Sequence, residues 1–177
     1  MHFWGRTQLA NGASMFIYQK GGRTRQLIKR IKYGGRKDLA YWLGIIYGRS
    51  LVQYDAFNQI DCIVPVPLHP ARFKERGYNQ SEWFARGLSR TMAIPVQKEW
   101  LFRTKSTHTQ TTKNRVERYQ NLKNVFRARK EGNLLGQHVL LVDDVLTTGA
   151  TLECCADQLM TLRPSKLSML TIAMGLG

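Results

Sequence analysis

Residues 139–151, VLLVDDVLTTGAT, form the stretch that decides the fold. Its first four residues are apolar, which is typical of a strand buried on both faces of a parallel sheet. Two aspartates follow, and ligands of open α/β sheets bind beyond the carboxyl ends of the strands. Gly149 permits a tight turn and close backbone approach. The segment therefore predicts a strand, a turn and a helix that together form a binding site.

The turn of this segment has the composition of a phosphate cradle. The first backbone amides of a helix have no partner within the helix, and the positive end of the helix dipole lies behind them. Threonine hydroxyls add further donors. We therefore expect a phosphate dianion to bind here without a lysine. The residues concerned are Thr147, Thr148, Gly149, Ala150 and Thr151.

The paired acids, Asp143 and Asp144, would repel a phosphate, so they must face another group. Vicinal ribose hydroxyls suit them, because a carboxylate accepts hydrogen bonds from both. The segment as a whole therefore predicts a site for a 5′-phosphoribosyl group. The alternative is an ordinary strand–turn–helix unit with acids at the strand end.

The remaining chain alternates apolar strands with amphipathic helices. This alternation predicts an α/β fold with a mainly parallel sheet and helices on both faces. In the helix at 37–51, we expect Leu39, Leu43, Ile46 and Tyr47 to face inward. The polar, threonine-rich residues 103–114 predict a mobile loop. Expected strands lie at 13–19, 61–66, 97–102, 125–126, 139–142 and 167–173, and expected helices at 24–32, 37–51, 81–92, 115–124 and 151–162.

The composition is strongly basic. The chain has 177 residues with 27 Lys+Arg against 12 Asp+Glu, a formal net charge of +15. This excess indicates an anionic partner, the alternative being a solvated surface with no specific partner. Eight cations and no acid occupy residues 20–37. These include the nucleic-acid candidates Arg25, Lys29 and Arg36.

The three cysteines include an adjacent pair and no CxxC spacing, which predicts neither a disulfide framework nor a zinc site. No apolar run approaches the roughly 20 residues that span a bilayer. The first residues also lack the apolar stretch of a signal peptide. We therefore expect a cytoplasmic protein.

Segment 139–151 resembles the phosphoribosyl pyrophosphate (PRPP) motif of type I phosphoribosyltransferases. The resemblance implies that fold, with a small N-terminal hood at 1–57 and a core at 58–177. It also implies that Asp143 and Asp144 bind the ribose hydroxyls, that residues 147–151 bind the 5′-phosphate, and that Mg²⁺ accompanies PRPP. Homodimers are common in this fold.

Two further stretches resemble the ComF (competence protein F) family of phosphoribosyltransferase-like proteins. They are VPVPLHPARFKERGYNQSEWFARGL at 64–88 and RTKSTHTQTTKNRVERYQNLKNVF at 103–126. Many members begin with a four-cysteine zinc module, which this sequence lacks, so either this line has no such module or the chain is part of a longer protein. The cations implied for pyrophosphate and for a mobile flap, each of which could equally be a solvated charge, are Arg72, Lys74, Arg76, Arg103, Lys105 and Arg115.

These resemblances leave three hypotheses about function. The first is a phosphoribosyltransferase that uses PRPP and Mg²⁺, with an acceptor that the sequence does not name. The second is an accessory protein of DNA uptake and natural transformation that binds single-stranded DNA without turnover. Tyr18, Tyr33 and Tyr41 would then offer stacking surfaces, unless they serve ordinary packing. The third is a regulator that senses PRPP without catalysis.

Overall fold

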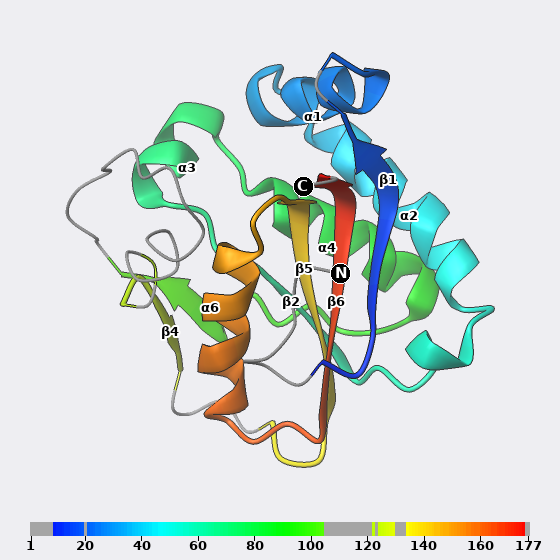
Figure 1. The fold of residues 1–177 in the computed structure, drawn as a ribbon, viewed down its shortest axis with the longest axis vertical. Helices are drawn as coiled ribbons and strands as arrows, with labels where there is room; N and C mark the ends of the chain where they lie inside the picture. The colour runs from blue at the N-terminus through cyan, green and yellow to red at the C-terminus, as the bar shows by residue number, and fades with distance from the viewer. Residues whose placement is uncertain (1–8, 20, 105–121, 123, 130–133, 176–177) are drawn as a thin grey trace.

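The computed structural model describes residues 9–19, 21–104, 122, 124–129 and 134–175 (Figure 1). Its centre is a four-stranded parallel sheet in the order β1-β6-β5-β2. A separate antiparallel pair joins β3 to β4. The elements are β1 (Gly12–Tyr18), α1 (Arg23–Tyr33), α2 (Lys37–Leu51), the 3-10 helix η1 (Asp55–Phe57), β2 (Cys62–Pro65), α3 (Pro70–Arg76), α4 (Gln80–Met92), β3 (Leu101–Arg103), β4 (Phe126–Ala128), β5 (His138–Leu146), α6 (Ala150–Met160) and β6 (Lys166–Gly175).

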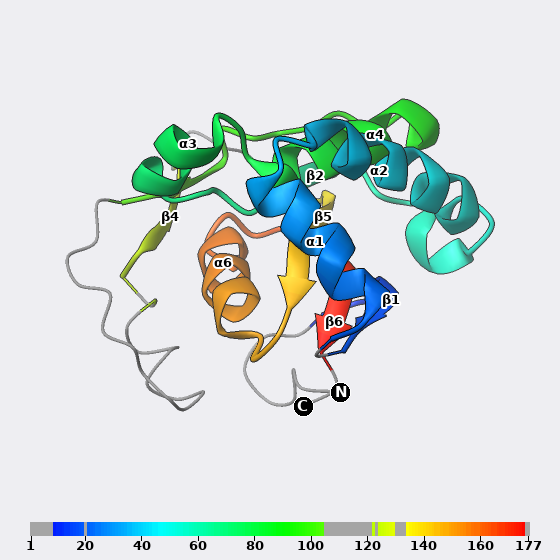
Figure 2. The ribbon, with the colours of Figure 1, turned by 90° about the horizontal axis from the view of Figure 1, so that it is seen from above.

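Helices cover both faces of the sheet, as the alternation predicts. Figure 2 shows α2 and α4 on one side of β5 and β6 and α6 on the other, while α1 crosses in front of the ends of these strands. Along β5, Leu140 and Val142 join the core beneath α1, α2 and α4. Val139 and Leu141 join the core beneath α6. Because successive side chains of a strand point to opposite faces, one continuous apolar run supplies both cores.

Helices α2 and α4 pack closely because glycine faces glycine where they cross. A Cβ added at Gly44 would collide with the Phe84 carbonyl, and one at Gly87 with the Tyr41 carbonyl. This approach sets the buried face of α2, which consists of Ala40, Gly44, Ile45, Gly48 and Leu51. The expectation that Ile46 faces inward is therefore wrong, since Ile46 is 52% exposed. The helical spacing of apolar residues picks out large side chains. The closest approach of α2 to α4 is instead made through Gly44 and Gly87.

The loop expected after β2 contains a helix, α3, which begins with Pro70 at its first turn and ends at Gly77 with φ of 75°. It has no buried residue, which explains why the apolar period does not reveal it. The strand expected at 97–102 is also different. Only its end contributes to β3, and β3 pairs with β4 outside the main sheet.

Strand β1 pairs with β6, and α1 and α2 share a core with α4. The division into a hood at 1–57 and a core at 58–177 stays a prediction. None of the helices in the described part of the chain is long and apolar enough to cross a membrane. The loop and helix expected at 103–124 lie almost entirely outside the described residues.

Candidate functional site

The two aspartates lie within β5, which continues for two residues beyond them to Leu146. The strand is thus longer than the apolar run 139–142 predicts. Asp143 and Asp144 are successive strand residues, so their side chains leave opposite faces of the sheet. Asp143 shares its face with Leu141, which packs with α6, and Asp144 shares its face with Val142, which packs with α1 and α4.

Asp143 is fixed by two hydrogen bonds to the same oxygen. Ser81 Oγ donates to Asp143 Oδ1 over 2.8 Å, and the backbone amide of Asp144 donates over 2.8 Å. Burial, followed by the neighbouring Asp144 charge, raises the pKa of Asp143 to about 7. The two hydrogen bonds and Lys32 act in the opposite direction. Asp143 can therefore exchange a proton near neutral pH.

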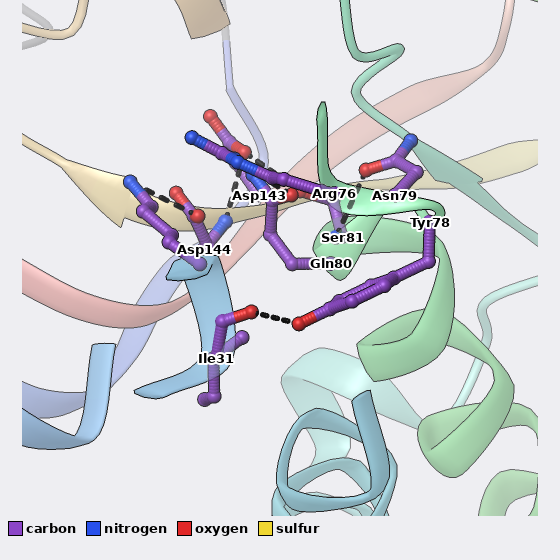
Figure 3. Close-up of polar contacts among 9 residues, drawn as sticks. Ile31, Arg76, Tyr78, Asn79, Gln80, Ser81, Asp143 and Asp144 are labelled. Carbon is purple, nitrogen blue, oxygen red and sulfur yellow. Dashed lines mark hydrogen bonds and ion pairs between the residues drawn. The ribbon is translucent and has the colours of Figure 1, made fainter. Parts of the chain in front are cut away.

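Asp144 is only 4% exposed and contacts a cation from the N-terminal part of the chain. Lys32 Nζ, on the last turn of α1, lies 3.1 Å from Asp144 Oδ2. A buried carboxylate without a partner is costly, and a nearby cation reduces that cost. Figure 3 shows this acidic pair between α1 and the start of α4.

The turn after β5 leads into a helix start that has no side-chain cap. Gly149 precedes α6 with φ of 82° and has no side chain to cap the helix. Helix geometry leaves the first amides of α6 without helical acceptors, and the helix dipole adds positive potential. Thr147 is exposed, whereas Thr148 and Thr151 are half-buried and Ala150 is buried. The structure thus places the five predicted phosphate residues on the turn and the start of α6, two residues after the acidic pair.

The predicted cations on α3 and β3 divide into different environments. Arg72 pairs with Glu75 over 2.7 Å on the surface. Lys74 lines a groove of about 420 Å³ together with Pro65, Pro67 and Phe73. Its neighbour Arg76 donates to Gln80 Oε1 over 3.0 Å, and Gln80 adjoins Ser81, the partner of Asp143.

Arg103 is largely enclosed. Its guanidinium lies 5.3 Å from the ring centre of Phe126, and burial lowers its pKa. This environment differs from that of a free surface cation. Lys105 and Arg115 lie outside the described residues.

The basic helix α1 presents Lys29 to solvent and Arg25 half-exposed. Arg36 is engaged in a two-pronged ion pair with Asp38, with Nη2–Oδ2 at 2.7 Å and Nε–Oδ1 at 2.9 Å. Tyr33 is 63% exposed. Tyr41 contacts Trp42 and Trp83 edge to face, so it serves packing.

Sequence reasoning missed Lys32 and Ser81 as neighbours of the acidic pair. Ser81 could be found only as the second residue after the N-cap of α4, Asn79, whose Oδ1 accepts from the Ser81 amide. No local pattern reveals Lys32, since it meets Asp144 through the tertiary fold. Within the described ranges, no three His, Cys, Asp or Glu side chains gather into a metal-binding group.

The protein thus belongs to the class of α/β proteins whose ligand site lies at the carboxyl edge of a parallel sheet. The features that indicate this class are the acidic pair on β5 and the start of α6, which has no side-chain cap. Among the solved structures with a similar fold is glutamine phosphoribosylpyrophosphate (PRPP) amidotransferase from B. subtilis, complexed with ADP and GMP. The TM-score is 0.53 at 19% identity, with 81% of this chain and 30% of that chain covered. The likeness establishes the type I phosphoribosyltransferase fold.

Residues 72–174 match the family model for the phosphoribosyl transferase domain. Competence protein F of Haemophilus influenzae is 43% identical over 93 residues, which are 52% of this chain and 41% of that protein. DNA utilization protein YhgH of Escherichia coli (strain K12) is 34% identical over 140 residues, covering 76% of this chain and 60% of that protein. The chain belongs to the phosphoribosyl transferase domain family and is of the ComF type. It matches about half of the length of these relatives.

Proposed function

We propose that this protein binds PRPP with Mg²⁺ at residues 139–151. The observation that carries the proposal is the placement of the acidic pair and the uncapped start of α6 on one continuous strand–turn–helix unit. Asp143 and Asp144 accept hydrogen bonds from the ribose hydroxyls. The amides and hydroxyls of residues 147–151 bind the 5′-phosphate.

Mg²⁺ enters with the pyrophosphate group in this proposal. Its preference for oxygen ligands and retained water suits phosphate oxygens better than a cage built wholly from protein. The chain's own contribution at that end is positive charge. Arg76 is the best placed of the predicted cations, because its partner Gln80 adjoins Ser81 and the acidic pair. Lys74 and Arg72 lie further along the same surface helix.

If the protein transfers the phosphoribosyl group, departure of pyrophosphate leaves positive charge on the ribose carbon. The carboxylates of Asp143 and Asp144 would stabilise that charge. Pyrophosphate release, measured over a panel of nucleobases and amines, distinguishes an enzyme from a PRPP-binding protein. A rate above that of Asp144→Asn with any acceptor would establish turnover.

We also propose a role in DNA uptake within the cytoplasm. The relatives named above are a competence protein and a DNA utilization protein. The net charge of +15 suits a partner larger than PRPP. The alternative is a protein that binds single-stranded nucleic acid without transferase turnover. That the protein forms a homodimer is also a proposal.

PRPP binding is tested by the melting temperature of the protein with and without millimolar PRPP and Mg²⁺. A ligand that binds the folded state alone raises the melting temperature. We expect a clear rise with PRPP–Mg²⁺ and a smaller one with ribose 5-phosphate, which lacks the pyrophosphate. No shift with PRPP would refute the ligand assignment.

DNA binding is tested by titrating single-stranded DNA at several salt concentrations. Affinity should fall steeply with salt, because each neutralised phosphate releases counterions. Changing Arg25, Lys29 and Arg36 to Glu should weaken DNA binding and leave the PRPP shift intact. The matched control changes three other exposed cations, Arg49, Arg90 and Lys166, to Glu. Equal losses in both triple variants would show that residues 25–36 do not form the DNA site.

A further inference from the structure

The last turn of α1 contacts the candidate site through three consecutive residues. The hydroxyl of Tyr78 donates to the backbone carbonyl of Ile31. Lys32 pairs with Asp144 over 3.1 Å. The ring of Tyr33 lies 5.0 Å beneath the guanidinium of Arg76. The three contacts reach different parts of the site. They join the end of α1 to the acidic pair of the site, to the end of α3 and to Tyr78, which lies between α3 and α4 (Figure 3).

The contact to Tyr78 fixes the position of the helix end. The last carbonyls of a helix have no helical donor, and a buried one needs another partner. Tyr78 is 6% exposed and supplies that donor to Ile31, while the Gly34 amide bonds the Arg30 carbonyl over 2.9 Å. The helix therefore ends against the site in a defined place, which carries Lys32 to Asp144.

Charge and burial give the Lys32–Asp144 contact its significance. The Asp144 side chain is 5% exposed, and that of Lys32 is 25% exposed. Removing one partner of a buried ion pair leaves an uncompensated charge, which is costly. Lys32 also lowers the pKa of the neighbouring Asp143, so loss of this cation would favour protonation of that carboxyl.

We propose that Lys32 is a positioning residue of the phosphoribosyl site, which favours the ionised form of the Asp143–Asp144 pair so that the pair accepts hydrogen bonds from the ribose. This inference rests on the proposed PRPP site and extends it to the N-terminal helix. It assigns α1 two separate parts: an exposed basic face, and a last turn that belongs to the ligand site.

The other groups that face the acidic pair do not replace this charge. Ser81, from α4, supplies a neutral hydroxyl to Asp143. Cys155, from α6, is buried beside Asp143, and burial raises the pKa of its thiol, so it stays neutral. Arg103 interacts with the same thiol from β3. Among the residues that the structure describes, Lys32 is the cation that contacts a carboxylate of the pair directly.

The experiment measures the Kd of PRPP–Mg²⁺ by calorimetry between pH 6.5 and 9.5 for wild type, Lys32→Met, Lys32→Arg and Arg30→Met. Arg30 is exposed and lies two residues before Lys32, so it controls for loss of one charge from α1. The ratio of the variant's Kd to that of wild type cancels the ionisation of PRPP itself. A rise of one unit in a carboxylate pKa lowers its ionised fraction about tenfold at pH values well below that pKa.

We expect the Lys32→Met ratio to rise toward about ten as the pH falls to 6.5 and to approach one by pH 9.5. Lys32→Arg should keep the wild-type profile, because it retains the charge. A purely structural role would give a ratio that does not change with pH. That result, or a ratio equal to that of Arg30→Met, would overturn the inference. Tighter binding by Lys32→Met at every pH would overturn it too, because Lys32 would then compete with the ligand.

A second measurement separates this inference from the ligand assignment. NMR titration of the aspartate carboxyl carbons follows the acidic pair in the free protein. Loss of Lys32 should raise the titration midpoint of the pair by about one unit, which corresponds to the tenfold ratio above. An unchanged midpoint would refute the role of Lys32 even if PRPP binds. A raised midpoint without any PRPP binding would instead refute the proposed function alone.

Discussion

The ribose end and the phosphate end of the candidate site are prepared in opposite ways. At the ribose end, both carboxylates are held by protein groups: Ser81 and a backbone amide for Asp143, and Lys32 for Asp144. At the phosphate end, Thr147 is exposed and the glycine before α6 contributes no cap. Both carboxylates therefore have protein partners in the ligand-free protein, whereas the phosphate end does not depend on such partners.

The difference follows from the cost of burying each kind of group. An ionised carboxylate away from water needs a charge or donors from the protein. A backbone amide at a helix start can be hydrated in the free protein and exchange water for phosphate. The ribose end therefore depends on distant residues, whereas the phosphate end depends on local backbone geometry. Substitutions at the two ends should accordingly have different effects on ligand affinity and on stability.

The largest effect should come from the ribose end, with Asp144→Asn. Loss of a charged acceptor costs about 2 kcal/mol or more, which corresponds to a thirtyfold or greater loss of affinity. We expect the PRPP-induced rise in melting temperature to disappear while the free protein still folds cooperatively. The control is Asp55→Asn, an exposed acid that accepts from Asn58 over 3.0 Å. A full shift in Asp144→Asn would remove this residue from the site.

A smaller effect is expected at the phosphate end, with Gly149→Ala. A side chain at φ of 82° is strained, and the change should cost about 1 kcal/mol of folding free energy. The matched variant Gly136→Ala has φ of 78° and open space around its Cβ. Both should lose similar stability in chemical denaturation. Only Gly149→Ala should also lose PRPP affinity, by about tenfold for one lost phosphate contact. Equal affinities in the two variants would contradict the assignment of the turn.

A more gradual effect is a pH dependence that the ribose end alone should show. The pKa of Asp143 is raised from 3.8 to about 7 in the folded protein. Between those values the folded state binds more protons than the unfolded state, so its contribution to stability falls as pH rises, by at most about 1.4 kcal/mol per pH unit.

Ligand affinity should rise over the same range, because the ribose needs the ionised acid. Unfolding free energies of wild type and Asp143→Asn between pH 5 and 8 test the first trend, and calorimetric titration with PRPP–Mg²⁺ tests the second. Parallel stability profiles for the two proteins would show that Asp143 has an ordinary pKa.

The sequence predicts what local chemistry determines. The apolar run 139–142, the helix start after Gly149 and the parallel sheet all follow from periodicity and turn residues, and the structure confirms them. The composition of α1 and α2 predicts their ranges almost to the residue.

What the sequence does not reveal depends on contacts between distant segments. Ile46 is exposed because Gly44 and Gly87 set the crossing of α2 and α4. Lys32 reads as one more cation in a basic helix, and only the fold brings it to Asp144. Arg36 likewise appears free until the structure shows its pair with Asp38. The partners of a charge are therefore the hardest part of this site to predict.

The most direct test of the central claim is a crystal structure of the protein with PRPP and Mg²⁺. We predict the 5′-phosphate against the amides of residues 147–151 and the ribose hydroxyls within hydrogen-bonding distance of Asp143 and Asp144. Lys32 should remain beside Asp144. A phosphoribosyl group bound elsewhere, for example in the groove lined by Lys74 and Phe73, would contradict the account.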